Sequence, residues 1–139
     1  MRVRLAKKAE LETVLTLQLQ ILPSDEPWPV ESAVWWLAFD DIGKVIGFAG
    51  LSQSARWSDA MYLCRSGVIE SARGKGVQRR LIQVRERWAR RNGRRWLITD
   101  THSNPASANS LIKRGFAMYI PRRPWAGDTA CYWRKDLHK

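Results

Sequence analysis

The 139-residue chain carries 24 Lys and Arg against 13 Asp and Glu, which gives a formal net charge of +11, and 45% of its residues are hydrophobic. This balance excludes an extended disordered chain and predicts one globular domain over residues 1–139. No apolar run is long enough to span a membrane, and no apolar stretch follows the basic start at residues 1–8 as it would in a secretory signal. We therefore expect a cytoplasmic protein with no membrane partner.

The two cysteines, Cys64 and Cys131, lie far apart and show no metal-ligand spacing. A scaffold held together by disulfides would need more cysteines than these two. We expect both thiols to be reduced and buried, and we expect no metal site.

The first half of the chain predicts a strand, a helix and a β-hairpin. Residues 2–6 alternate as a short strand, and residues 8–20 follow as a helix. The apolar residues of this helix recur at helical spacing: Leu11, Val14, Leu15 and Leu19. Three prolines in residues 23–29 end the helix and predict an ordered loop or a flexible lid. Residues 35–40 and 45–52 then form the hairpin.

The second half predicts four strands and two helices. Residues 60–68 form a strand, and a glycine-rich stretch at residues 71–76 leads into a long helix that Asn92-Gly93 ends. One apolar stripe marks this helix: Val77, Leu81, Val84 and Trp88. The remaining elements follow in order: a strand at residues 95–99, a helix capped by Ser103 or Asn104 and ended by Gly115, and strands at residues 116–120 and 129–135.

The predicted order of elements is therefore β-α-β-β-β-α-β-α-β-β. A mixed order with a central hairpin is typical of an α+β domain. We expect a three-layer arrangement, in which helices cover both faces of one mixed, mostly antiparallel sheet.

The positive charge is concentrated in residues 73–95, which hold ten basic residues and one acid, Glu86. A field of this sign attracts phosphates, nucleic acid or an acidic protein partner. It disfavours a strongly cationic acceptor unless a local acidic pocket overrides it. The alternative interpretation is a solvated helix face that only helps to keep the protein in solution.

The stretch Arg73-Gly74-Lys75-Gly76 joins a predicted strand to a predicted helix. Glycines let backbone N–H groups approach a ligand closely, and a helix N-terminus adds partial positive charge. The spacing matches neither a P-loop nor a dinucleotide-binding fingerprint. The pattern predicts an anion-binding turn, with a plain tight turn as the alternative.

Two segments together indicate a family. Residues 73–78 read Arg-Gly-Lys-Gly-Val-Gln between a strand and a helix, and residues 104–116 form an Asn-led helix that closes on Gly-Phe. Both resemble motifs of the GCN5-related N-acetyltransferases (GNATs), and the element order fits that family over nearly the whole chain. The resemblance implies a GNAT-like acyl-CoA N-acyltransferase fold, acetyl-CoA or another acyl-CoA as co-substrate, and an amine acceptor.

The resemblance also implies roles for individual residues. The strand ending at Val68 would diverge from its neighbour and offer backbone groups to the pantetheine arm, and Asn104 would lie beside the cofactor. Arg73 would shape the loop, and the backbone amides after it would hold the pyrophosphate: Gly74, Lys75, Gly76, Val77 and Gln78. The thioester would lie between the two strands, where a strand amide would polarise its carbonyl.

Two residues depart from the family pattern. Gln78 stands where the family has Gly or Ala, so its side chain either crowds the pyrophosphate or reaches past it. Leu111 stands where many members have a tyrosine that protonates the thiolate. Since leucine donates no proton, the candidates for the acid are Tyr119, Ser107 and water, or the thiolate leaves as an anion.

The base that deprotonates the amine is open among Glu70 beside the diverging strand, Asp100 at the end of the next strand and His102 just after it. Their alternative roles are a solvated loop acid, a turn former and a surface or capping residue. Glu26 in the proline-rich loop is a further candidate on the acceptor side. The loop residues Trp28 and Trp125 lie beside prolines and are candidates to line an acceptor pocket.

Three functions follow as hypotheses. The first is an acyl-CoA-dependent N-acyltransferase in which the amine attacks the thioester directly in a ternary complex. The second is a GNAT-like protein that acts on or binds nucleic acid, as in phage-type DNA modification, with the basic helix and Arg122, Arg123 and Trp125 facing phosphates. The third is a degenerate member that binds CoA without catalysis. The oligomeric state stays open.

Overall fold

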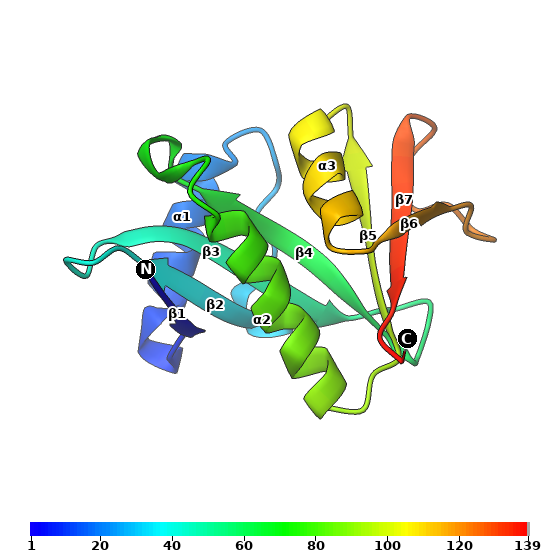
Figure 1. Cartoon of the computed structure of the whole chain (residues 1–139), viewed down its shortest axis with the longest axis horizontal. Coiled ribbons are helices and arrows are strands. Elements are labelled where there is room, and N and C mark those ends of the chain that lie inside the picture. The colour runs from blue at the N-terminus through cyan, green and yellow to red at the C-terminus, as the bar shows by residue number, and fades with distance from the viewer. Residues whose placement is uncertain (139) are drawn as a thin grey trace.

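The computed structural model describes residues 1–138 and contains one mixed sheet with helices on both of its faces (Figure 1). Within these residues the strands lie in the order β1-β2-β3-β4-β5-β7-β6, and every neighbouring pair is antiparallel except β4 and β5. The strands are β1 (Arg2–Leu5), β2 (Val34–Phe39), β3 (Val45–Gln53), β4 (Ala60–Val68), β5 (Trp96–His102), β6 (Ala117–Tyr119) and β7 (Ala130–Asp136). The helices are α1 (Leu11–Ile21), α2 (Val77–Arg91) and α3 (Pro105–Lys113), with short 3-10 turns η1 (Lys8–Glu10), η2 (Val30–Ser32) and η3 (Glu70–Ala72). The predicted α+β class and order of elements are confirmed.

Two apolar cores form, one on each face of the sheet. Along β2, Trp36 and Ala38 pack into the core beneath α2 and α3, whereas Trp35, Leu37 and Phe39 pack into the core beneath α1. Successive residues of a strand point to opposite faces, so a strand buried on both faces is apolar throughout. Figure 1 shows α2 and α3 in front of the sheet and α1 behind it.

The helix α1 meets the sheet with a different face from the predicted one. Val14, Leu17 and Gln18 are buried, while Leu15 and Leu19 are exposed. The sequence offers leucines on more than one side of this helix, so periodicity alone leaves its rotation open. Packing against the sheet selects the side that includes Gln18, whose amide binds the chain of the proline-rich loop.

The helix α2 buries two charged side chains that the sequence pattern assigned to a basic surface. Arg85 and Glu86 are fully buried, whereas Val84 and Trp88 of the predicted stripe are only half-buried. The Glu86 carboxylate accepts hydrogen bonds from Arg114 (3.2 Å) and Lys135 (3.0 Å). These contacts connect α2 with the end of α3 and with β7, so Glu86 is buried only with cationic partners.

The strands β4 and β5 pair only at their beginnings, where residues 60–62 face residues 96–98. Beyond that point they diverge, as Figure 1 shows for the upper part of the sheet. A β-bulge accompanies the divergence, because Leu63 pairs with Leu51 and Ser66 with Ala49, which leaves two residues of β4 opposite the single residue Gly50. Within residues 1–138, no helix is long and apolar enough to cross a membrane.

Candidate active site

A cleft of about 530 Å³ opens where β4 and β5 diverge. It is lined by α2 and α3 on one face of the sheet and by residues of the proline-rich loop and the loop after β6 on the other. Thr99 Oγ1 donates a 3.0 Å hydrogen bond to the carbonyl of Leu63 and so bridges the two strands just beyond their last pair. The cleft therefore has lining residues on both faces of the sheet, beneath α2 and α3 on one side and toward α1 on the other.

The glycine-rich loop before α2 is shaped for close approach by a ligand. Gly74 and Gly76 have φ values of 76° and 82°, and nothing lies within 4 Å of a Cβ placed on either residue. The Nε of Arg73 donates to the carbonyl of Val68 (3.2 Å), which fixes the loop to the end of β4. The first N–H groups of α2 have no acceptor inside the helix and carry its positive dipole end, so this loop offers an anion site.

Of the residues assigned to cofactor binding, two belong to the cleft lining, whereas Val68 and residues 73–77 do not. Gln78 and Asn104 both line the cleft, from α2 and from the start of α3. Gln78 Nε2 donates to Ser66 Oγ on β4 (3.2 Å), so this side chain reaches across to the strand. Asn104 Oδ1 accepts the Ser107 N–H (3.1 Å) and caps α3.

On the side of α1, three side chains converge on Asp100. Its Oδ1 accepts hydrogen bonds from the Tyr62 hydroxyl (2.5 Å) and from Trp125 Nε1 (3.1 Å), and its Oδ2 lies 3.0 Å from His102 Nε2. The Asp100 side chain is 10% exposed, whereas that of His102 is 49% exposed. The arrangement is an aspartate that orients a histidine, with the histidine facing solvent and the cleft.

Tyr62 serves this cluster as a hydrogen-bond donor. Burial raises the pKa of its hydroxyl far above the usual tyrosine range, and the Asp100 charge and hydrogen bond raise it further. The phenol therefore stays protonated at every pH at which the protein is expected to work. Tyr62 was not among the sequence candidates, although the parallel register that pairs it with Ile98 brings it next to Asp100, two residues farther along β5.

Aromatic rings surround the Asp100 cluster. The ring centroids of Trp28 and Tyr62 lie 5.6 Å apart, and those of Tyr62 and Trp125 lie 6.4 Å apart. These three residues also line a second, smaller cavity of about 340 Å³ that adjoins the cleft. The backbone of Trp28 is held at both its N–H and its C=O by the buried Gln18 amide (2.7 and 3.1 Å), which makes the proline-rich loop an ordered wall.

Of the remaining candidates for the acid and the base, some line the cleft and others lie outside it. Ser107 and Leu111 of α3 line the cleft, and Leu111 is 5% exposed. Glu70 is exposed in η3 and is not among the cleft-lining residues. Tyr119 lies on β6 beside Arg134, away from the cleft lining. Glu26 accepts a hydrogen bond from Arg65 through its backbone carbonyl, and its neighbour Asp25 lines the cleft in its place.

Two further cleft residues were missed as site residues in the sequence. Cys64 lies in the β-bulge, where its sulfur and the Trp35 ring would each be 2.6 Å from a Cβ on Gly50. Burial raises the pKa of the Cys64 thiol to about 11, so the thiol is neutral near pH 7. Arg85 enters the cleft from α2, and only its charge, not its position, was visible in the sequence. No cluster of three or more potential metal ligands occurs among residues 1–138.

Diverging central strands with a cleft between them, and a glycine-rich loop at the start of α2, are the features of an acyl-CoA N-acyltransferase fold. The chain matches the sequence model of the acetyltransferase (GNAT) family over residues 6–116, and it belongs to that family. Members of the family use acetyl-CoA or another acyl-CoA as co-substrate. The expected family and fold are thereby confirmed.

Solved structures with the same fold cover nearly the whole chain. A ribosomal-protein-alanine N-acetyltransferase from Brucella melitensis has a TM-score of 0.77 at 18% identity, covering 98% of this chain and 99% of its own. An IAA acetyltransferase from Bacillus cereus has a TM-score of 0.76 at 18% identity, covering 97% and 98%. A GCN5-related N-acetyltransferase from Kribbella flavida has a TM-score of 0.74 at 21% identity, covering 97% and 96%. No curated protein sequence matches the chain.

Proposed function

We propose that the protein is an acyl-CoA-dependent N-acyltransferase that transfers an acetyl or other acyl group to an amine by direct attack in a ternary complex. One observation carries the proposal: a single cleft is lined both by Gln78, directly after the glycine loop, and by the Asp100–His102 pair. In this proposal the donor lies on the side of α2 and α3, and the acceptor lies on the side of α1. Membership of the GNAT family supports the same reaction class.

On the donor side, the amides of residues 74–78 hold the pyrophosphate of CoA, and Arg73 keeps their loop in place. The pantetheine arm runs between the diverging strands toward the bulge, past Val68 on one side and Asn104 on the other. Open space beside Gly74 and Gly76 supports this assignment, because a bulky phosphate needs close access to the backbone. Gln78 lies across the cleft on Ser66, so its amide is a partner for the arm rather than an obstacle to the loop.

On the acceptor side, the amine enters between Trp28 and Trp125 and loses its proton to His102, which Asp100 orients. The amine nitrogen attacks the thioester carbonyl, a C–N bond forms, and the C–S bond breaks as CoA leaves. A base within hydrogen-bond reach of the amine is worth about 10²–10⁴ in rate. The partly exposed imidazole and the nearly buried carboxylate suit these two roles.

The position on α3 at which many family members have a tyrosine holds Leu111, which donates no proton to the leaving thiolate. Ser107, one helical turn earlier on α3, lines the cleft, whereas the hydroxyl of Ser110 donates to the Ala106 carbonyl. We assign protonation of the thiolate to Ser107 or to water that it holds. Tyr119, which lies outside the cleft lining, has no part in this assignment.

The proposal is tested by a thiol-release assay with acetyl-CoA and a panel of primary amines that includes aromatic, aliphatic and amino-acid amines. We expect release of CoA that depends on the amine, with an acylated amine detected by mass spectrometry. CoA binding without any amine-dependent release across the panel would support the degenerate, non-catalytic alternative. Absence of CoA binding would contradict the whole assignment.

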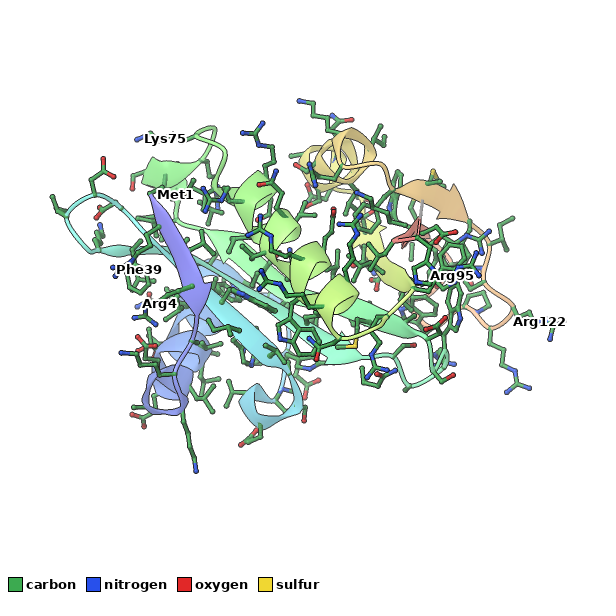
Figure 2. The ribbon with its side chains drawn as sticks, turned by 60° about the horizontal axis from the view of Figure 1, so that its bottom comes forward. Met1, Arg4, Phe39, Lys75, Arg95 and Arg122 are labelled. Carbon is green, nitrogen blue, oxygen red and sulfur yellow. The ribbon has the colours of Figure 1, made fainter. Side chains whose placement is uncertain are left out.

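A second candidate function is binding of nucleic acid or an acidic partner, favoured by the outer face of α2. Most basic residues of the 73–95 region are exposed: Arg73, Lys75, Arg79, Arg87, Arg90, Arg91 and Arg95. Figure 2 shows Lys75 and Arg122 projecting at opposite ends of the molecule, so one short duplex would not meet both. We expect any DNA binding to run through phosphates along α2 and to weaken steeply between low and physiological salt. Salt-independent binding would contradict this account.

A further inference from the structure

Arg85 is an unusual residue to find inside the cleft. Gln78, Ile82 and Arg85 recur along α2 so that they share the helix face that lines the cleft. Arg85 is only 1% exposed, and it is the bulkiest side chain among the fully buried ones of residues 1–138. A guanidinium therefore lies among the apolar cleft residues Leu63, Ile82 and Leu111.

Only some of the N–H groups of this guanidinium have a hydrogen-bond acceptor within the described residues. Arg85 Nε donates to the carbonyl of Leu81 (3.0 Å), and Nη1 donates to the carbonyl of Gly50 (3.2 Å). Within the described residues, Nη2 makes no hydrogen bond and is not sealed from the cleft. A guanidinium has five N–H groups in a planar fork, so donors remain for a ligand.

Among residues 1–138 no carboxylate pairs directly with this guanidinium, although the charge of Glu86 acts on it through space. Arg85 forms no ion pair within residues 1–138, and the carboxylate of its neighbour Glu86 is bound to Arg90, Arg114 and Lys135. Burial lowers the pKa of Arg85 to about 10, which still leaves it protonated near neutral pH. The nearby Cys64 thiol is neutral there, since burial raises its pKa to about 11. A buried cation without a counter-ion is costly, and an anionic ligand group would offset that cost.

The position of the charge points to the acyl group of the donor. Arg85 binds the Gly50 carbonyl, which lies opposite the bulge of β4 formed by Cys64 and Arg65. In the proposed function the thioester lies at this bulge, and the glycine loop takes the phosphates. An acyl chain that continues past the thioester would enter a part of the cleft that Leu63, Ile82, Leu111 and the Arg85 guanidinium line.

We propose that the preferred donor is an acyl-CoA whose acyl chain ends in a carboxylate, a monothioester of a short dicarboxylic acid, and that Arg85 binds this carboxylate. The inference rests on the proposed function, because it needs CoA in the cleft. The transfer itself is unchanged: the C–N bond forms, the C–S bond breaks, and the terminal carboxylate passes to the product intact. A purely structural Arg85 that only holds the bulge through Gly50 is the competing explanation.

The test compares three probes by calorimetry: CoA, butyryl-CoA and succinyl-CoA, which has the same four-carbon chain as butyryl-CoA with a terminal carboxylate. We expect the wild type to bind succinyl-CoA at least about tenfold more tightly than butyryl-CoA, as one buried ionic hydrogen bond requires. Arg85→Met should abolish this preference while leaving the affinity for CoA within about twofold, since the phosphate loop is untouched. Arg85→Lys, which keeps the charge and loses the fork, should retain part of the preference.

The possible results distinguish failure of the carboxylate-binding role of Arg85 from failure of the proposed function. Equal wild-type affinity for succinyl-CoA and butyryl-CoA, with CoA itself bound, would overturn the inference and leave the proposed function standing. Failure to bind any of the three probes would overturn the proposed function, and the inference with it. If Arg85→Met does not fold, the wild-type comparison and Arg85→Lys still decide, because neither depends on removing the buried charge.

Discussion

The two sides of the cleft are built differently. The proposed donor side comes from two contiguous segments, the glycine loop at residues 73–77 with the cleft residue Gln78 directly after it, and the α3 segment from Asn104 to Leu111. The acceptor side is assembled from four separate places: the proline-rich loop, β4, β5 and the loop after β6. A contiguous motif can be identified from the sequence alone. The residues of a site that strand pairing brings together can be identified only when the pairing of the strands is known.

The largest expected effect is on the donor side. Gly76→Glu should abolish acetyl-CoA binding in calorimetry, because a carboxylate would occupy the space beside the loop and repel the pyrophosphate. Gly93→Glu is the matched control, since Gly93 also has a positive φ (74°) and open space around it but lies at the other end of α2. Both variants carry the same backbone strain and added charge. Unchanged affinity in Gly76→Glu would remove the loop from the donor site.

The next effect separates the acceptor side from the donor side. Asp100→Asn keeps the shape of the side chain but removes the charge that orients His102, so we expect kcat to fall by about 10²–10⁴ with little change in the affinity for CoA. Steady-state kinetics of amine-dependent thiol release measures both. Glu70→Gln distinguishes the candidates, since Glu70 lies outside the cleft lining and should change kcat by less than about twofold. A large loss in Glu70→Gln and none in Asp100→Asn would reverse the assignment.

The sequence predicted the donor side of the site better than the acceptor side. The element order, the glycine loop and the α3 motif were visible, because each depends on local spacing. The convergence of Tyr62, Trp125 and His102 on Asp100 was not, because it depends on β4 pairing in parallel with β5 and on a loop folding back beside them. Nor was the burial of Arg85 and Glu86, since a charged residue gives no sign in the sequence of a partner across the fold.

A smaller effect is expected at Leu111, which lines the cleft on the donor side. Leu111→Ala should destabilise the protein by about 2–5 kcal/mol, because Leu111 is buried in the core beneath α2 and α3. Leu111→Tyr should raise turnover modestly or leave it unchanged, since it adds a hydroxyl where thiolate protonation is assigned to Ser107. Thermal unfolding and turnover are measured on both variants. Unchanged stability of Leu111→Ala with complete loss of thioester cleavage would mean that Leu111 shapes the reaction centre directly.

The smallest effect tests whether water reaches the Cys64 thiol at the β4 bulge. In a Cys131→Ser variant, Cys64 is the only thiol, and we expect it to resist iodoacetamide near pH 7.5. Its pKa is raised to about 11 by burial, so the reactive thiolate, and with it the alkylation rate, should increase as the pH rises toward that value. Bound CoA should slow the reaction further, because Cys64 lines the cleft. Rapid alkylation at pH 7.5 would show that water reaches the bulge freely.

The central claim is that the donor lies between β4 and β5, and a crystal structure of the protein grown with CoA tests it most directly. The account predicts a pantetheine arm in the cleft between the diverging strands, with the pyrophosphate on the amides of residues 74–78 and the thiol near the bulge at Cys64. CoA bound on the outer basic face of α2, with the cleft empty, would contradict it.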